Sequence, residues 1–223
     1  MAPTVLSPAS PVELLHYIIT FQAYPTTLLI CYSREDFVTT LVSEAQENKL
    51  EEDSRTTEER LPLPLLSATL YQTAVARHIR ILFIPTVVHL RAYLSAFDPS
   101  DSLTQPPPRY PPPPSGKRQP PLLLVYGLLN LHRDTSEWSA QGLSNSAAAL
   151  LEAAQRTEFK PVVVEPKGAG GHEDFKAVLQ DDVPVLSGSS RRDEGVWTGR
   201  TVKMKQVLGR WFRFQTGQWG VLR

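Results

Sequence analysis

Apolar residues along the chain follow two patterns, short continuous runs and longer stretches with helical spacing. The continuous runs are TTLLICY, RILFI, LLLVY and PVVVE, which begin at residues 26, 80, 122 and 161. Runs of this length, rich in Leu, Ile and Val, are typical of strands that are buried on both faces. Between these runs apolar residues recur every three or four positions, which predicts helices.

Two of the predicted helices carry clear start signals. Ser10 can cap a helix, Pro11 suits its first position, and Glu13 can reach back to complete a capping box. Ser33 is the predicted cap of the next helix, with Asp36 three residues later. Further helices are predicted at about 88–97, 136–156 and 174–180.

The alternation of buried strands with helices predicts an α/β protein with a mainly parallel sheet and helices on both faces. From residue 196 onward, apolar and polar residues nearly alternate in VWTGRTVKMKQVLGRWFRF, which predicts two or three antiparallel strands at the C-terminal edge.

We expect a single domain over residues 1–223 with a proline-rich insertion at about 98–121. Nine of the sixteen residues from 106 to 121 are proline. Such a segment favours extended polyproline II over a place in the core.

Composition narrows the class of protein. The chain of 223 residues has a formal net charge of zero, but residues 191–223 contain eight Lys/Arg and two Asp/Glu. Cys31 is the single cysteine, which excludes an intramolecular disulfide and a metal cluster built on thiolates. The first residues show no secretory signal, and every apolar run is shorter than the ~20 residues of a membrane span. The sequence therefore predicts a soluble intracellular protein.

The order of strands and helices resembles the RecA-like core of recombinases and their paralogues. In that family the first strand feeds the phosphate loop, a later apolar strand ends in an acidic residue for magnesium, and C-terminal strands extend the sheet. Here TTLLICYSREDF stands at the expected phosphate loop, and LLLVYGLL stands at the magnesium-binding strand. Tyr126 occupies approximately the place of the expected aspartate. The resemblance covers most of the chain, but it concerns element order and lacks the family's motifs.

The absence of the family's motifs argues against binding and hydrolysis of ATP. A phosphate loop needs glycines that free backbone N–H groups, a lysine for charge and a Ser/Thr for magnesium. Residues 26–41 contain no glycine, and no lysine precedes residue 49. Glu35 and Asp36 fall in the first helical turn, where they stabilise the positive helix end and repel a triphosphate. We therefore expect no ATP hydrolysis, no cofactor and no bound metal.

The same resemblance implies contact with DNA through the loops after the third and fourth core strands. These loops are NLHRDTSEW (130–138) and EPKGAGGHEDF (165–175). Lysine and arginine on such loops bind phosphate without reading the base sequence. With the basic C-terminal residues, the candidates are Arg133, Lys167, Arg191, Arg192, Lys203 and Lys205. Ordinary surface loops, and an edge strand whose lysines prevent aggregation, are the alternatives.

The C-terminal strands contain a second pattern that suits nucleic acid. Arg210, Phe212 and Phe214 are predicted to share one face of a strand. Cations interleaved with aromatic rings are typical of surfaces that bind single-stranded nucleic acid.

The proline-rich insertion contains Pro107, Pro108, Arg109 and Tyr110, which resembles the P-P-x-Y ligand of WW domains. Polyproline II is preorganised for the grooves of such domains. A WW-domain partner is one hypothesis for this segment, and a chance match in a tract so rich in proline is the other.

Other chemistry has weaker support. The five histidines show no two-ligand spacing for zinc, and the chain contains no G-x-S-x-G sequence. A catalytic Ser–His–Asp triad whose residues are distant in sequence is not excluded by these patterns. A small-molecule enzyme with a pocket at residues 168–174 is a further hypothesis.

Together these patterns predict a non-enzymatic accessory or scaffold subunit of a homologous-recombination DNA-repair complex in the nucleus. The resemblance implies a RecA-like partner subunit and contact with single-stranded or branched DNA. RecA-like chains without catalytic motifs include the Shu-complex subunits and the Elongator subcomplex that acts on tRNA. An Elongator-type scaffold in tRNA modification, in the cytoplasm, is therefore the alternative.

Overall fold

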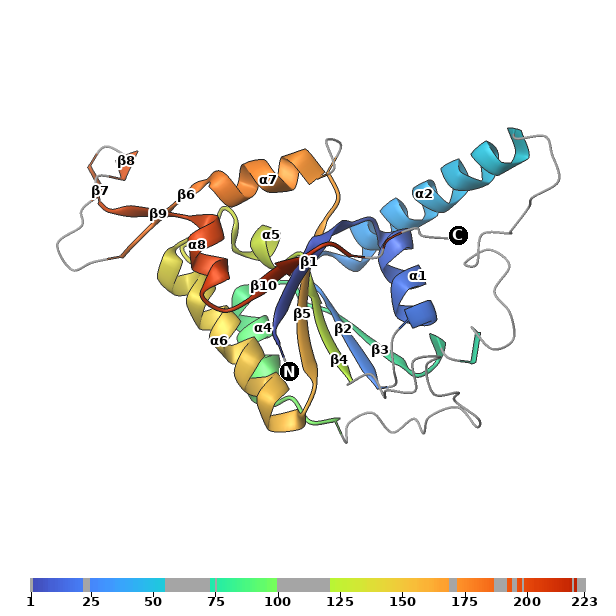
Figure 1. Cartoon of the computed structure of the whole chain (residues 1–223), viewed down its shortest axis with the longest axis horizontal. Coiled ribbons are helices and arrows are strands. Elements are labelled where there is room, and N and C mark those ends of the chain that lie inside the picture. The colour runs from blue at the N-terminus through green and yellow to red at the C-terminus, as the bar shows by residue number, and fades with distance from the viewer. Residues whose placement is uncertain are drawn as a thin grey trace.

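The computed structural model contains a parallel β-sheet between two layers of helices (Figure 1). It describes residues 2–21, 25–54, 73–74, 76–99, 121–168, 172–186, 192–193, 196–197, 199–217 and 219. Within these ranges, no helix combines the length and the apolar character that a bilayer span needs. The insertion predicted at about 98–121, with Pro107, Pro108 and Tyr110, falls almost wholly outside the described residues.

Six strands form the main sheet, and all their pairings are parallel. Their order across the sheet is β10 (Arg213–Gln215), β1 (Thr4–Ala9), β5 (Lys160–Pro166), β4 (Leu122–Tyr126), β2 (Thr26–Ile30) and β3 (Ile79–Phe83). The strands predicted from the four apolar runs are confirmed as β2, β3, β4 and β5. The prediction of an α/β protein with a mainly parallel sheet is confirmed with them.

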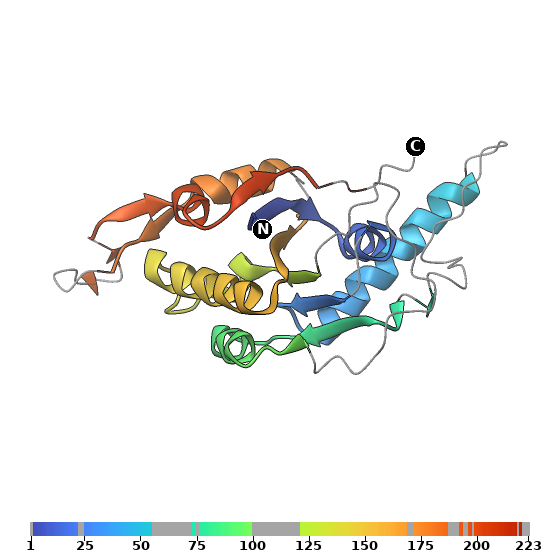
Figure 2. The ribbon, with the colours of Figure 1, turned by 60° about the horizontal axis from the view of Figure 1, so that its bottom comes forward.

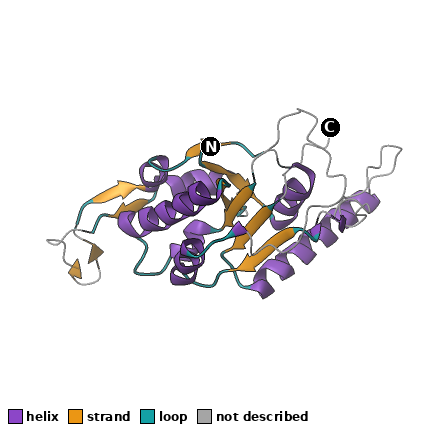
Figure 3. Cartoon of the chain, turned by 90° about the horizontal axis from the view of Figure 1, so that it is seen from below, coloured by secondary structure: helices purple, strands orange, loops and turns teal. Residues whose placement is uncertain are grey.

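Helices cover both faces of this sheet (Figures 1 and 3). One face carries α4 (Val87–Ser95), α6 (Ala140–Thr157) and α8 (Met204–Gly209), and the other carries α1 (Pro11–Phe21) and α2 (Arg34–Ser54). Near the carboxyl ends of the strands lie α5 (Leu128–His132) and α7 (His172–Gln180). The distal half of α2 extends beyond the sheet (Figure 1).

Side chains of the central strands alternate between two separate cores. In β4, Leu123 and Val125 join the core beneath α4 and α6, whereas Leu122, Leu124 and Tyr126 join the core beneath α1 and α2. All five side chains are buried. A strand that is buried on both faces needs apolar residues at every position, and this explains the continuous run in the sequence.

One strand, β1, is not predicted by the sequence pattern. Its sequence, TVLSPA, includes a serine and a proline that disfavour a strand. It nevertheless lies between β5 and β10 with all its residues buried. Pro8 is tolerated because it falls between Leu6 and Ala9, where the register with β5 is irregular.

The C-terminal edge differs from the prediction of antiparallel strands there. The edge strand β10 runs parallel to β1. Two antiparallel pairs form separate small sheets, one from β6 (Asp182–Pro184) and β9 (Thr201–Lys203), the other from β7 (Arg192–Asp193) and β8 (Val196–Trp197). Residues 204–209 form α8 because Met204, Val207 and Leu208 recur at helical spacing and are all buried.

Candidate functional site

The carboxyl ends of the parallel strands meet at one edge of the sheet, where open α/β sheets bind their ligands. The helices that follow these strands begin at this edge. A helix start presents free N–H groups and a partial positive charge, which together attract phosphate. The groups that occupy these helix starts therefore decide whether the edge can bind a nucleotide.

The start of α1 is closed by side chains of the protein. Ser10 Oγ accepts a hydrogen bond from the Glu13 N–H at 3.2 Å, and Glu13 Oε2 accepts one from the Ser10 N–H at 2.9 Å. Pro11 has no N–H, and the Val12 N–H donates to Glu44 Oε2 on α2 at 3.2 Å. The predicted capping box is confirmed, and the Val12 and Glu13 N–H groups are both occupied.

Two carboxylates thus stand at the helix start that follows the first strand. Lys167 Nζ donates to Glu13 Oε1 at 3.0 Å and pairs with that carboxylate. A phosphate group at this position would break existing hydrogen bonds and face the charges of Glu13 and Glu44. The resemblance to recombinases implies a phosphate loop after the first strand, and β2 was predicted to be that strand because the sequence pattern does not predict β1. In the structure the first strand is β1, and the helix that follows it is α1.

The start of α2 is closed in a similar way. Ser33 Oγ accepts a hydrogen bond from the Asp36 N–H at 3.0 Å, and its hydroxyl donates to Asp36 Oδ2 at 2.6 Å. Ser33 is therefore the cap that the sequence predicts. Glu35 and Asp36 add negative charge to the first turn, which complements the helix dipole.

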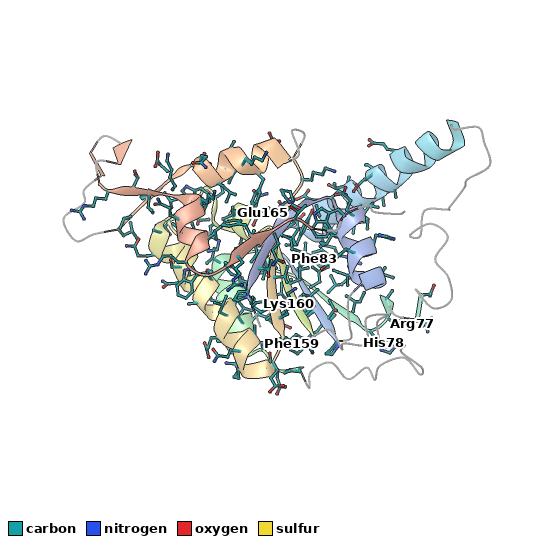
Figure 4. The ribbon with its side chains drawn as sticks, viewed as in Figure 1. Arg77, His78, Phe83, Phe159, Lys160 and Glu165 are labelled. Carbon is teal, nitrogen blue, oxygen red and sulfur yellow. The ribbon has the colours of Figure 1, made fainter. Side chains whose placement is uncertain are left out.

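Glu165, near the end of β5, occupies the start of α5. Its Oε1 accepts a hydrogen bond from the Leu129 N–H at 2.9 Å, and its side chain is buried. Burial raises the pKa of Glu165 to about 8, although N–H groups of α5 and the nearby Arg133 favour the ionised form. Figure 4 places Glu165 at the opposite end of β5 from Lys160. The Glu165 carboxyl group therefore occupies the start of α5 at the carboxyl edge of the sheet.

Tyr126 ends β4, where the resemblance to recombinases implies a magnesium-binding acid. Its hydroxyl donates to the Ala9 carbonyl oxygen at 2.9 Å, and burial raises its pKa. A neutral phenol is a poor ligand for magnesium, which prefers carboxylates. The next residue, Gly127, has a φ of 85°, and a Cβ there would clash with the Tyr32 ring. In the part of the chain that the structure describes, no cluster of three His, Cys, Asp or Glu residues could hold a metal.

A serine–histidine pair occurs in the structure, but it is inaccessible. His132 Nε2 lies 2.9 Å from Ser146 Oγ, and Nδ1 lies 2.8 Å from the Leu128 carbonyl oxygen. These contacts assign the proton to Nδ1, and burial lowers the pKa of His132. Arg91 Nε donates to Ser146 Oγ at 2.9 Å, and both members of the pair are 0% exposed. No substrate reaches Ser146, so this pair links α4, α5 and α6.

Two of the predicted DNA-binding residues, Arg133 and Lys167, line one depression of about 340 Å³ between α5 and α7. Each already pairs with a carboxylate, Arg133 with Asp181 at 3.7 Å and Lys167 with Glu13 at 3.0 Å. Arg133 also lies over the Trp138 ring, 5.2 Å from its centroid. Because exposed pairs contribute only about 0–1 kcal/mol, a phosphate can compete for these cations.

The other predicted cations are distributed differently. Lys203 pairs with Asp182 at 2.9 Å, and Lys205 is exposed on α8. Lys203 ends β9 whereas Lys205 lies in α8, because the chain enters a helix at Met204, so the predicted C-terminal strand does not hold both lysines. Arg192 belongs to β7, a strand whose side chains the structure does not describe, and Arg191 lies outside the described residues.

Sequence reasoning missed the roles of Glu44 and Glu165. Glu44 caps α1 because α2 packs against it, and no local pattern carries that information. Glu165 left a signal, since it is an acidic residue within the apolar run PVVVEP. A carboxyl group inside a buried strand is costly unless it has a partner, so its position indicates a specific contact.

The sequence matches no protein-family model and no curated protein at significant similarity, so the function is inferred from this geometry.

Proposed function

We propose that this chain is a non-catalytic accessory subunit of a homologous-recombination DNA-repair complex in the nucleus. It pairs with a RecA-like partner subunit and contacts the DNA backbone through cations. The RecA-like identity of its fold is part of the proposal, and element order supports it.

The closed helix starts at the carboxyl edge carry the non-catalytic part of the proposal. Glu13 and Glu44 occupy the start of α1, Ser33 with its partner Asp36 that of α2, and Glu165 that of α5. A nucleoside triphosphate would meet carboxyl groups where nucleotide-binding proteins offer free N–H groups. A sheet in which the starts of α1, α2 and α5 are closed by the protein's own side chains is better suited to a scaffold than to an ATPase.

Exposed apolar residues support a partner subunit. Val38 and Val42 of α2 are 42% and 48% exposed, and they share one face because they are four residues apart. Ile81 is 44% exposed on β3, which is an edge strand among the strands that the structure describes. An open strand edge with exposed apolar side chains favours association with another chain.

The depression between α5 and α7 supports contact with DNA backbone. Arg133 and Lys167 come from separate loops and line it together. Their carboxylate partners are exposed or partly exposed, so phosphates can replace them.

Affinity purification of the tagged protein from its native cells, followed by mass spectrometry, tests the proposal. We expect a RecA-like subunit and repair factors to be recovered with it. Recovery of tRNA-modifying subunits without repair proteins would contradict the repair role and favour an Elongator-type scaffold. A monomer with no partner would contradict both scaffold functions.

A further inference from the structure

The C-terminal segment that forms β9, α8 and β10 is rich in basic residues. From residue 195 to the C-terminus the chain contains six Lys/Arg and no Asp or Glu. Figure 2 shows β9, α8 and β10 following one another along one side, with α7 beside them. Because Asp182 of β6 pairs with Lys203, the excess positive charge of this segment lies on α8 and β10, where it attracts polyanions.

The exposed face of α8 carries part of this charge. Lys205, Gln206, Gly209 and the following Arg210 are exposed, while the other side of the helix packs into the core. Lys205 lies four residues from Gly209, and Gln206 lies four from Arg210, so the members of each pair are neighbours on the exposed half of the helix. Lys205, Arg210 and the nearby Arg213 form no ion pair with any residue that the structure describes. This distinguishes them from Arg133, Lys167 and Lys203.

Phe214 on β10 adds an aromatic ring to this face. Its side chain is 36% exposed, and a Cβ at Gly209 would lie 3.9 Å from Phe214 Cε2. Because Gly209 has no side chain, the neighbouring ring stays uncovered on that side. Phe212, which the sequence predicts on the same face, is buried in the core instead.

We propose that Lys205, Arg210 and Phe214 form a binding surface for single-stranded DNA. The phenyl ring stacks on one base, and the two cations bind the flanking phosphates. A single strand fits better than a duplex, because duplex bases are already stacked and present no free face. This inference rests on the DNA contact in the proposed function and assigns that contact a second location, away from the depression at Arg133.

Fluorescence anisotropy of a labelled oligothymidylate, titrated with the full chain over a salt series, tests this surface. Phe214→Leu keeps an apolar side chain but removes the stacking ring. We expect it to weaken binding roughly 5- to 150-fold, the range for loss of one stacked base, without changing the salt dependence. Gly209→Leu covers the ring and leaves every charge in place, so it should weaken binding in the same way.

The cations should show a different signature. Lys205→Gln and Arg210→Gln should each weaken binding and flatten the slope of log affinity against log salt by about 0.7, the value per phosphate on a single strand. Arg34→Gln is the matched control, because Arg34 is an exposed cation on α2, on the opposite side of the sheet. We expect it to bind like the wild type.

Wild-type affinity in Phe214→Leu and Gly209→Leu, with thermal unfolding confirming the fold, would overturn the stacking surface. Binding to oligouridylate but not to oligothymidylate, or absence of binding by the chain and by its complex, would also overturn it. None of these results bears on recovery of a repair partner, so failure of this inference is distinguishable from failure of the proposed function.

Discussion

At the scale of single residues, Glu165 shows how a buried carboxyl group replaces a ligand. Its side chain accepts a hydrogen bond from the Leu129 N–H at the start of α5 and so occupies that helix start. Burial raises its pKa from 4.5 to about 8, so the folded protein retains a proton that the unfolded chain releases. The contribution of Glu165 to stability is therefore fully present below about pH 4.5 and is lost as pH rises through about 8.

Glu165→Gln should remove this pH dependence, because an amide keeps the acceptor oxygen and never ionises. We expect the variant to exceed the wild type in unfolding free energy above about pH 8, by an amount on the order of a few kcal/mol. Urea unfolding over a pH series measures the difference. His132 works in the opposite direction in both proteins, since its lowered pKa removes stability as pH falls through 6.5. Glu35→Gln, at an exposed carboxylate, is the control, and an unchanged pH profile in Glu165→Gln would contradict this role.

At the scale of elements, the two sides of α2 have different roles. Its inner side packs on the sheet through Phe37 and supplies Glu44 to the start of α1. Its outer side exposes Val38 and Val42. The inner side explains the closed phosphate position, and the outer side explains the proposed partner contact.

Replacing both Val38 and Val42 with aspartate should abolish recovery of the partner subunit. The chain itself should keep its stability within about 0.5 kcal/mol per substitution, as is usual for surface positions. Copurification and thermal unfolding measure the two effects. Thr39→Asp with Ser43→Asp is the matched control, because it adds the same charges one position further along exposed α2. Full partner recovery with the valine variant would contradict the assignment of this face.

At the scale of the whole molecule, local patterns predicted most of the sheet. The strands β2 to β5 follow from apolar runs, and the caps at Ser10 and Ser33 follow from residue types that compete for helix N–H groups. By contrast, β1 is stabilised by neighbours distant in sequence, which override its unfavourable Ser7 and Pro8. Residues 204–209 were predicted as strand because apolar and polar residues nearly alternate there. Met204, Val207 and Leu208 also fit the spacing of a helix, and the chain forms α8.

The candidate site was harder to predict than the fold. The resemblance to recombinases selected the loops with Arg133 and Lys167, but the depression that both residues line follows from the adjacency of β4 and β5, which the sequence pattern did not predict. The pairing of these cations with Asp181 and Glu13 depends on tertiary contacts that no local pattern records. For the same reason Glu44 gave no signal at all.

The most direct measurement of the central claim is calorimetric titration of the full chain with Mg·ATP and with Mg·ADP. A nucleotide-binding RecA-like protein in the same buffer serves as the positive control. Because the protein's own side chains occupy the starts of α1, α2 and α5, we predict no saturable binding of either nucleotide. Saturable binding with one nucleotide per chain would contradict the account of a closed, non-catalytic sheet.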